Sequence, residues 1–339
     1  MALLEVNDLR VYYKTRRELL RAVEGVSFQV EEGQNVGLIG ESGCGKTTVV
    51  KSILRLLPRS ARVEGQVSFQ GRDLLTLKRP ELDKIRGKQI ALVPQSAMDA
   101  LDPVLRIGDQ IVEAIQAHEE TAGRTAREKV AGLFDLVGLD SKRLNHYPHQ
   151  FSGGMRQRAI IAMSLALTPK LIVADEATTG LDVLVQDQVL HEIEDIHRRF
   201  NISVLFVTHD IGIVAETCQR IAVMYAGKIA EYADARSLFE EPYHPYTLGL
   251  MNAYPSVRGP KHELISIPGS PPDLVDPPSG CRFTPRCPFA CEICQQEEPE
   301  LVETGRDNWA ACHRVGEIDQ LRTKAGKALT WKRMAMNQV

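Results

Sequence analysis

The chain has 339 residues, of which 43% are hydrophobic and 25% are charged, and its formal net charge is −3. This composition is ordinary for a globular protein with one large domain and a smaller one, or with two domains, and the net charge gives no global reason to expect nucleic-acid binding. No apolar run approaches the roughly 18 residues that cross a bilayer, and the N-terminus lacks a signal-peptide pattern, so we expect a cytosolic protein whose membrane role comes through a partner.

The N-terminal part of the chain predicts short strands separated by turns. Residues 3–9 and 26–30 are β-rich, and the pair Tyr12-Tyr13 follows the first of them. Residues 35–39 are uniformly apolar and predict a buried strand. Residues 48–56 carry apolar side chains at helical spacing and predict a helix.

Between this strand and this helix lies a glycine-rich octapeptide, which reads Gly40-Glu41-Ser42-Gly43-Cys44-Gly45-Lys46-Thr47. Strand, glycine-rich turn, Gly-Lys-Thr and helix together predict a phosphate-binding loop. Its backbone N–H groups would hold phosphate oxygens, and the positive end of the helix would face them. Lys46 would add a charge for the outer phosphates, and the Thr47 hydroxyl would ligate Mg²⁺.

The next segments predict an inserted helical subdomain. Residues 65–71 predict a strand and turn, and residues 89–93 predict a strand that stops at Pro94-Gln95. Residues 107–118 and 124–137 then carry apolar side chains at helical spacing. We therefore expect a helical subdomain over about residues 96–155.

Further along, buried strands alternate with helices. Helices are predicted over residues 155–167 and 183–200, and strands over residues 171–174 and 203–207. This alternation predicts a largely parallel sheet that binds ligands at the carboxyl ends of its strands.

Polar side chains follow these strands, at the edge where a ligand would bind. Asp175 could hold Mg²⁺, and the adjacent Glu176 could polarise the water that attacks a γ-phosphate. Gln95 is a candidate to contact Mg²⁺ and this water, and His209 is a candidate to hydrogen-bond the γ-phosphate. Taken alone, Asp175 and Glu176 are better explained as solvated acids at a strand end. Gln95 could likewise be a polar strand-end residue, and His209 a hydrogen-bonded surface histidine.

After residue 232 the pattern breaks, and proline-rich stretches predict little regular structure. We expect a main domain over residues 1–237 and a small irregular extension over residues 238–339. The extension holds five of the seven cysteines, in a segment over residues 280–313, namely Cys281, Cys287, Cys291, Cys294 and Cys312. In a reducing compartment such clustering predicts a metal site rather than disulfides.

In this order, the motifs resemble those of the ATP-binding cassette (ABC) ATPases. Gly40–Thr47, with Thr48 beside it, resembles the Walker A motif, residues 171–175 the Walker B motif with catalytic Glu176, and Gln95 the Q-loop. Further matches are the signature motif Phe151-Ser152-Gly153-Gly154-Met155, the D-loop that ends in Asp182, the switch histidine His209, and the adenine-stacking Tyr13, with Tyr12 as the alternative.

The resemblance implies the fold, the chemistry and the partners of the chain. The fold would be α/β, a P-loop ABC ATPase domain with a mainly parallel core sheet, an N-terminal antiparallel part and the helical subdomain. Ser152, Gly153 and Gly154 would bind ATP held by a partner subunit, so that ATP closes a dimer and its hydrolysis opens it. The cofactors would be ATP and Mg²⁺.

Segments near the signature and in the extension resemble the ATPases of dipeptide and oligopeptide importers. They are residues 147–158, 241–247, 280–288 and 311–313. The implied role is to power peptide import at the cytoplasmic face of the membrane. The partners would be a second, related but distinct ABC ATPase, two permease subunits and, through the complex, an extracytoplasmic solute-binding protein. Importers of nickel, glutathione and some oligosaccharides share these segments, so the solute stays open.

The same resemblance implies a [4Fe-4S] cluster on Cys281, Cys287, Cys294 and Cys312, with Cys291 as a non-ligand and Zn²⁺ as the alternative. Two other functions compete with transport. One is a soluble ABC ATPase acting on DNA or ribosomes, against which the single cassette and the lack of a basic stripe argue. The other is an iron–sulfur redox protein regulated by ATP, against which the general base Glu176 argues.

Overall fold

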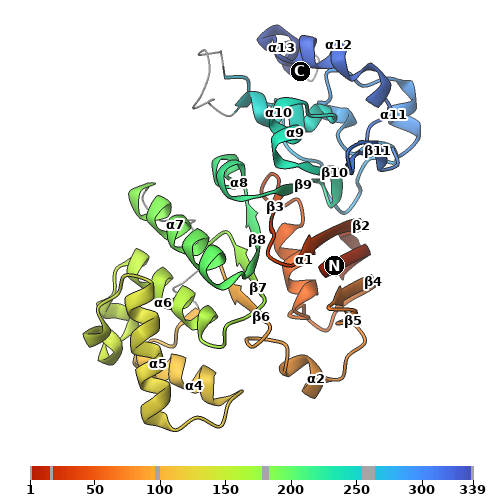
Figure 1. Ribbon diagram of the computed structural model, residues 1–339. Coiled ribbons are helices and arrows are strands. Elements are labelled where there is room, and N and C mark those ends of the chain that lie inside the picture. The colour runs from red at the N-terminus through yellow and green to blue at the C-terminus, as the bar shows by residue number, and fades with distance from the viewer. Residues whose placement is uncertain (1, 16–17, 96–99, 178–182, 254–263, 337–339) are drawn as a thin grey trace. The chain divides into compact units, whose positions relative to one another are not determined.

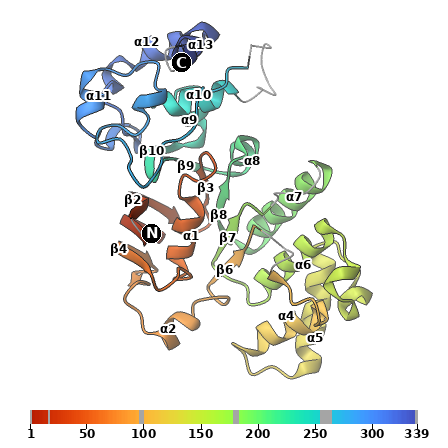
Figure 2. The same cartoon turned by 180° about the vertical axis from the view of Figure 1, so that it is seen from behind.

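The computed structural model describes residues 2–15, 18–95, 100–177, 183–253 and 264–336 (Figures 1 and 2). The chain divides into two compact units that are each assembled from separate segments. The first unit is built mainly from residues 30–35 and 76–207, and the second from residues 3–29, 36–75 and 208–339. The domain boundary predicted at residue 237 falls inside the second unit, and it remains a prediction.

A parallel sheet forms the core of the first unit. Its strands are β6 (Ile90–Val93), β7 (Leu171–Asp175) and β8 (Ser203–Thr208). β7 pairs with both neighbours, so that Leu171 lies opposite Ile90 on one side and Ser203 on the other. β7 and β8 are buried along their whole lengths, which explains why their sequences are continuous apolar runs. The residues that follow β6 and β7 therefore meet at one edge.

The helices of the first unit include those predicted over residues 107–118 and 124–137, while the bounds of the helical subdomain stay a prediction. They are α2 (Arg79–Asp83), α4 (Ile107–Gln116), α5 (Gly123–Leu136), α6 (Gly153–Leu165) and α7 (Val183–Phe200), with 3₁₀ helices at Ser141–Asn145 and Pro148–Gln150. Helices α4, α5 and α6 lie side by side (Figures 1 and 2). Ile111 and Ile115 of α4 and Phe134 of α5 are fully buried. Their helical spacing is the pattern that predicted these helices.

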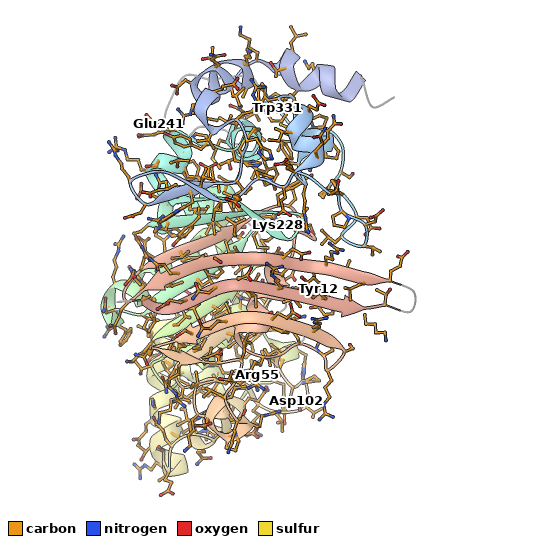
Figure 3. The ribbon with its side chains drawn as sticks, turned by 90° about the vertical axis from the view of Figure 1, so that its right-hand side faces the viewer. Tyr12, Arg55, Asp102, Lys228, Glu241 and Trp331 are labelled. Carbon is orange, nitrogen blue, oxygen red and sulfur yellow. The ribbon has the colours of Figure 1, made fainter. Side chains whose placement is uncertain are left out.

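An antiparallel sheet forms one layer of the second unit, as predicted for the N-terminal part. Its order is β2 (Leu19–Glu31), β1 (Ala2–Lys14), β4 (Ala61–Phe69) and β5 (Arg72–Asp73). Figure 3 shows Tyr12 on the long strands of this sheet. In β1, Leu4 lies opposite Phe69 of β4, and both side chains are buried.

The second unit also contains the strand that leads into the glycine-rich loop. This strand, β3 (Asn35–Ile39), runs parallel to β9 (Arg220–Tyr225), and β10 (Lys228–Asp234) continues antiparallel from β9. Two short strands from the extension, β12 (Asn308–Ala310) and β11 (Val302–Gly305), add to the edge of β10. Helix α1 (Lys46–Ile53) follows β3 after the loop.

The extension contains more helix than the sequence predicted. Helices α8 (Ile211–Thr217) and α9 (Ala235–Glu240) lead into it, and α10 (Pro245–Ala253), α11 (Glu292–Gln296), α12 (Ile318–Ala325) and α13 (Ala328–Met336) lie within it, with 3₁₀ turns at Thr284–Arg286 and Val315–Glu317. Trp331 of α13 is buried, and its indole N–H donates a hydrogen bond to Ala325 at 2.9 Å. Within the described ranges, every helix is too short or too polar to cross a bilayer.

Candidate nucleotide-binding site

Three glycines shape the predicted phosphate loop, and each has a positive φ angle. A Cβ atom at Gly40 would lie 2.2 Å from the carbonyl oxygen of Met224, and one at Gly45 would lie 2.4 Å from that of Ala22. Other backbone segments therefore exclude any side chain at these two positions. Gly43 has φ +80° and no atom within 4 Å of the site of a Cβ, so the loop is open there.

The ammonium group of Lys46 lies inside this loop. Lys46 is 4% exposed, and its Nζ donates hydrogen bonds to the carbonyl oxygens of Gly40 at 2.7 Å and Glu41 at 3.1 Å. Helix α1 begins at Lys46 without a side-chain cap at Gly45, and half-buried Thr47 lies in its first turn. A helix N-terminus beside a lysine is a binding site for an anion such as phosphate.

The two tyrosines of β1 differ in their contacts. The Tyr13 hydroxyl lies 3.4 Å from Oγ1 of Thr48 in α1, next to the phosphate loop. The Tyr12 hydroxyl instead donates a 2.7 Å hydrogen bond to Glu24, and burial together with this bond raises the pKa of Tyr12. Neighbouring residues of a strand face opposite sides. The hydroxyl of Tyr13 therefore lies beside the phosphate loop, whereas that of Tyr12 is held by Glu24.

In the first unit, the structure brings Gln95, Asp175 and Glu176 to the edge where β6 and β7 end. Asp175 is the last residue of β7 and is 5% exposed. The backbone N–H of Glu176 donates to the carbonyl oxygen of Val207 at 2.7 Å, and Glu176 adopts a φ of +49°. This left-handed conformation is uncommon outside glycine and is often found at functional sites. The carboxylate of Glu176 accepts a hydrogen bond from the side-chain amide of Gln95 at 2.8 Å.

The predicted signature motif lies at the exposed N-terminus of α6. Ser152 caps this helix, because its hydroxyl accepts a hydrogen bond from the backbone N–H of Met155 at 3.3 Å. A Cβ atom at Gly154 would lie 2.5 Å from a methyl group of Val185 in α7, so glycine is required for the two helices to pack. Ser152 and Gly153 are exposed, as a contact with a phosphate on another subunit requires.

His209 comes directly after β8, where the chain enters the second unit, and its side chain is exposed. The carboxylate of its neighbour Asp210 caps α8 by accepting the backbone N–H of Gly212 at 2.8 Å. Asp182, the predicted D-loop residue, lies outside the described residues. The phosphate loop, Tyr13 and His209 thus belong to the second unit, whereas Gln95, Asp175, Glu176 and the signature belong to the first.

The four cysteines predicted to bind a cluster line one narrow pocket together with His244, Phe283 and Phe289. Cys291 does not line it, but its Sγ lies 3.4 Å from Sγ of Cys294. Burial raises the pKa of Cys312 to about 12 and that of Cys287 well above its ordinary value, which keeps both as thiols. Among the described residues, no three His, Cys, Asp or Glu side chains converge on the position of one metal ion. This finding does not support the predicted metal site.

Two residues near the site have no sequence signal of their own. Arg286 and Tyr246 belong to the extension, yet both contact Glu41 of the phosphate loop. They lie within segments that resemble peptide-importer ATPases, residues 280–288 and 241–247, and this position is the one signal that could have pointed to them.

The chain matches two known protein families. The family described as "ABC transporter" matches residues 23–179, and the family described as "Oligopeptide/dipeptide transporter, C-terminal region" matches residues 230–294. The solved structure of the ATP-binding cassette MJ0796, a dimer in a post-hydrolysis state bound to ADP and Pi, has a TM-score of 0.63 and 28% identity, and the match covers 69% of this chain and 99% of that one.

Curated relatives match nearly the whole chain. The probable peptide ABC transporter ATP-binding protein y4tR of Sinorhizobium fredii is 47% identical over 94% of this chain and 97% of its own length. The oligopeptide transport ATP-binding protein OppD of Salmonella typhimurium is 43% identical over 90% of this chain and 92% of its own. From the loop geometry, the strand-end carboxylates and these matches, the chain belongs to the ABC transporter ATPases, in the group of oligopeptide and dipeptide transport ATP-binding proteins.

Proposed function

We propose that the chain hydrolyses ATP to power the import of di- or oligopeptides across the cytoplasmic membrane. The observation that carries the ATPase part is Lys46, which is buried inside a glycine-built loop at the N-terminus of α1. Relatives that are named as peptide transport proteins support the peptide part.

The residues of the nucleotide-binding site would have the following roles in ATP binding and hydrolysis. Lys46 and the loop N–H groups bind the triphosphate, and Tyr13 stacks on adenine. Glu176, oriented by Gln95 at 2.8 Å, accepts a proton from the attacking water. His209 hydrogen-bonds the γ-phosphate. Thr47, Asp175 and Gln95 supply the oxygen ligands that suit Mg²⁺, which neutralises charge on the transferred phosphoryl group when bound.

We infer that the ATP site is completed in trans. Ser152, Gly153 and Gly154 at the N-terminus of α6 would bind the γ-phosphate of ATP held by a partner subunit, and the partner's own signature would do the same for the ATP bound at Lys46. Asp182 would lie at the same dimer interface. We propose that this partner is a second, distinct ABC ATPase. Two permease subunits would anchor the pair at the cytoplasmic face of the membrane, and a solute-binding protein would deliver the peptide from outside.

We also propose that Cys281, Cys287, Cys294 and Cys312 hold a [4Fe-4S] cluster that braces the extension. The support is that these four thiols line one pocket. Each cysteine of such a cluster binds a different iron, so the four sulfurs need not converge on one point as they must around Zn²⁺. Ligation requires thiolates, so the cluster would have to lower the thiol pKa values that burial raises.

Purification from membranes tests the transport proposal. The chain should co-purify with two permease subunits and a second ATPase, and the complex in proteoliposomes should take up a di- or oligopeptide when ATP is supplied. K46A should stop uptake in the same assembled complex. A chain that never associates with a membrane protein would contradict the proposal, and uptake of a different solute would correct the substrate.

A further inference from the structure

Glu41, the second residue of the phosphate loop, is held through all three of its polar groups. Its backbone N–H donates a hydrogen bond to the hydroxyl of Tyr246 at 3.0 Å. Its carboxylate accepts two hydrogen bonds from Arg286, at 2.6 Å and 3.0 Å. Its carbonyl oxygen accepts the ammonium of Lys46 at 3.1 Å. Two of these three contacts come from the extension, although it follows the loop by about 200 residues.

Arg286 is itself fixed in place. It is 3% exposed, its Nε donates to the carbonyl oxygen of Pro268 at 2.9 Å, and Nη1 also reaches the hydroxyl of Tyr225 at 3.3 Å. A guanidinium held by these contacts presents its fork to Glu41 in one orientation. A bidentate arginine–carboxylate pair of this kind combines strength with directional specificity.

Tyr246 belongs to an aromatic cluster under the loop. It is fully buried, and the centroid of its ring lies 4.6 Å from the ring centroid of Tyr225 and 5.4 Å from that of Phe283. Tyr225 ends β9, the parallel neighbour of β3, which leads into the loop. The hydroxyl that fixes the backbone of Glu41 is therefore set by packing rather than by a flexible side chain.

Arg286 neutralises the negative charge of Glu41, which would otherwise oppose phosphate binding. It is the only acidic residue of Gly40–Thr47, a loop whose ligand would be a highly charged anion. An unpaired carboxylate at this position would repel the triphosphate, and its repulsion would be felt strongly in a partly buried loop. Pairing with Arg286 cancels this charge and holds the carboxylate against the extension.

We propose that Arg286 and Tyr246 are positioning residues for ATP, so that the extension forms part of the ATP site by fixing Glu41. The proposal rests on the assignment of the loop to the triphosphate. It predicts that the charge balance of the Glu41–Arg286 pair sets ATP affinity, whereas a purely structural pair would affect only the stability of the fold.

Binding of Mg-ATP to the purified full chain tests this, with titration calorimetry as the readout. R286Q should raise the Kd about tenfold, because it leaves the carboxylate unpaired. The double variant E41Q/R286Q should return to within about threefold of the wild type, because neither charge remains. In the assembled transporter, R286Q should raise the KM for ATP more than it lowers kcat.

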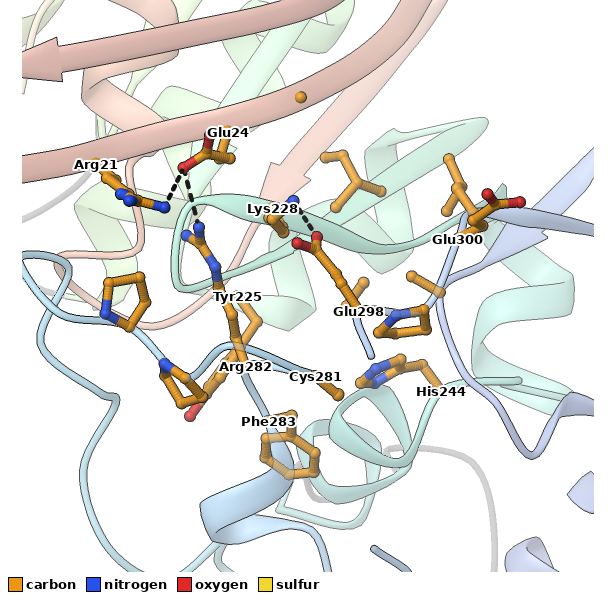
Figure 4. A pocket seen from close by; sticks show the side chains of 18 of the residues that line it. Arg21, Glu24, Tyr225, Lys228, His244, Cys281, Arg282, Phe283, Glu298 and Glu300 are labelled. Atoms are coloured by element: carbon orange, nitrogen blue, oxygen red, sulfur yellow. Dashed lines mark hydrogen bonds and ion pairs between the residues drawn. The ribbon is translucent and has the colours of Figure 1, made fainter. Parts of the chain in front are cut away.

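Arg282 provides the matched control. It is 6% exposed and pairs with Glu24 at 3.2 Å, beside a pocket of about 580 Å³ (Figure 4), and it has no hydrogen bond to the phosphate loop among the described residues. R282Q should lower the melting temperature as R286Q does but leave the Kd for ATP unchanged. Equal losses of affinity in both variants would assign the effect to general destabilisation and overturn the proposal.

Further outcomes also decide between the proposal and a purely structural pair. A folded R286Q that binds ATP like the wild type, or a double variant as weak as R286Q, would overturn the proposal. If R286Q fails to fold, Y246F keeps the ring packing and removes the hydroxyl, and ATP affinity equal to that of the wild type would then overturn it. If the wild type binds ATP and K46A does not, the loop binds the triphosphate whatever the result for R286Q.

Discussion

The side-chain amide of Gln95 donates a 2.8 Å hydrogen bond to the carboxylate of Glu176. The two residues are 81 positions apart, and they meet because β6 and β7 are parallel neighbours that end at the same edge. A base oriented in this way is ready for a water molecule without rearrangement.

E176Q should therefore reduce ATP hydrolysis by at least about a hundredfold, since general-base catalysis contributes roughly that much or more. ATP affinity should be unchanged, because Glu176 is not a ligand of the phosphates. Phosphate release by the assembled transporter and calorimetric binding of Mg-ATP measure the two quantities. Hydrolysis at the wild-type rate would exclude Glu176 as the base.

Substitutions at Ser152 can distinguish its role as the cap of α6 from its proposed role in phosphate binding. S152A removes the cap and should cost about 1 kcal/mol of stability. S152D keeps a good capping group but places a negative charge at the γ-phosphate contact. S152D should thus fold as well as the wild type and still lose turnover in the dimer. An active S152D transporter would argue against a phosphate contact at this helix terminus.

Tyr13 and Tyr12 can be distinguished by their contacts. Y13A should raise the KM for ATP, because it removes the ring beside Thr48, and stacking on a base is worth about 1–3 kcal/mol. Y12A should instead destabilise β1, because the hydroxyl of Tyr12 binds Glu24. The KM values of the two variants decide the matter, and a larger increase for Y12A would reverse the assignment.

Glu231 predicts a pH dependence of stability. It is 2% exposed on β10, and its two carboxylate oxygens accept the backbone N–H groups of Tyr243 at 2.7 Å and His244 at 2.9 Å. Burial raises its pKa from 4.5 to about 7, although these hydrogen bonds oppose the shift. Between pH 4.5 and 7 the folded chain thus keeps a proton that the unfolded chain has released.

The contribution of Glu231 to stability is therefore full below pH 4.5 and is lost as the pH rises through 7. Between these two pH values the free energy of unfolding falls by up to about 1.4 kcal/mol per pH unit because of Glu231. E231Q should remove this slope, while lowering stability overall because the amide nitrogen would face a backbone N–H group. Denaturant unfolding at several pH values measures the slope. E240Q, at an exposed position of α9, should behave like the wild type.

The cysteine pocket gives a prediction about iron content. Anaerobically purified wild-type chain should carry about four irons and absorb visible light, and C287S should lose both signals. C291S should retain them, because Cys291 does not line the pocket. Zinc in place of iron would favour the alternative metal, and wild-type protein without either metal would refute the cluster.

The sequence predicted the parts of the fold that depend on local pattern. Strands such as β7 and β8 are buried throughout, so each is a continuous apolar run that can be recognised without any partner. The phosphate loop is equally local, because its glycines, Lys46 and the start of α1 are adjacent in the chain. Parallel topology then placed Gln95 and Glu176 at one edge.

The parts that were missed depend on distant contacts. β12 has three residues, too few for any periodicity, and it exists because β10 offers a free edge. Helix α12 has only eight residues, and its buried side chains, Ile318, Leu321 and Ala325, make a weak helical pattern. The pair of Arg286 with Glu41 joins residues 245 positions apart, and neither residue has a local signal for the other.

The pairing of β12 with β10 affects how the protein can be divided. Tyr232 lies opposite Trp309, and Glu231 lies opposite Ala310, so a chain cut at residue 237 would lose the strand that covers β10. The bare edge would present unpaired backbone groups to neighbouring molecules, which is a common route to aggregation. An isolated cassette should therefore precipitate for lack of this strand, and inactivity of such a fragment would say nothing about the catalytic residues.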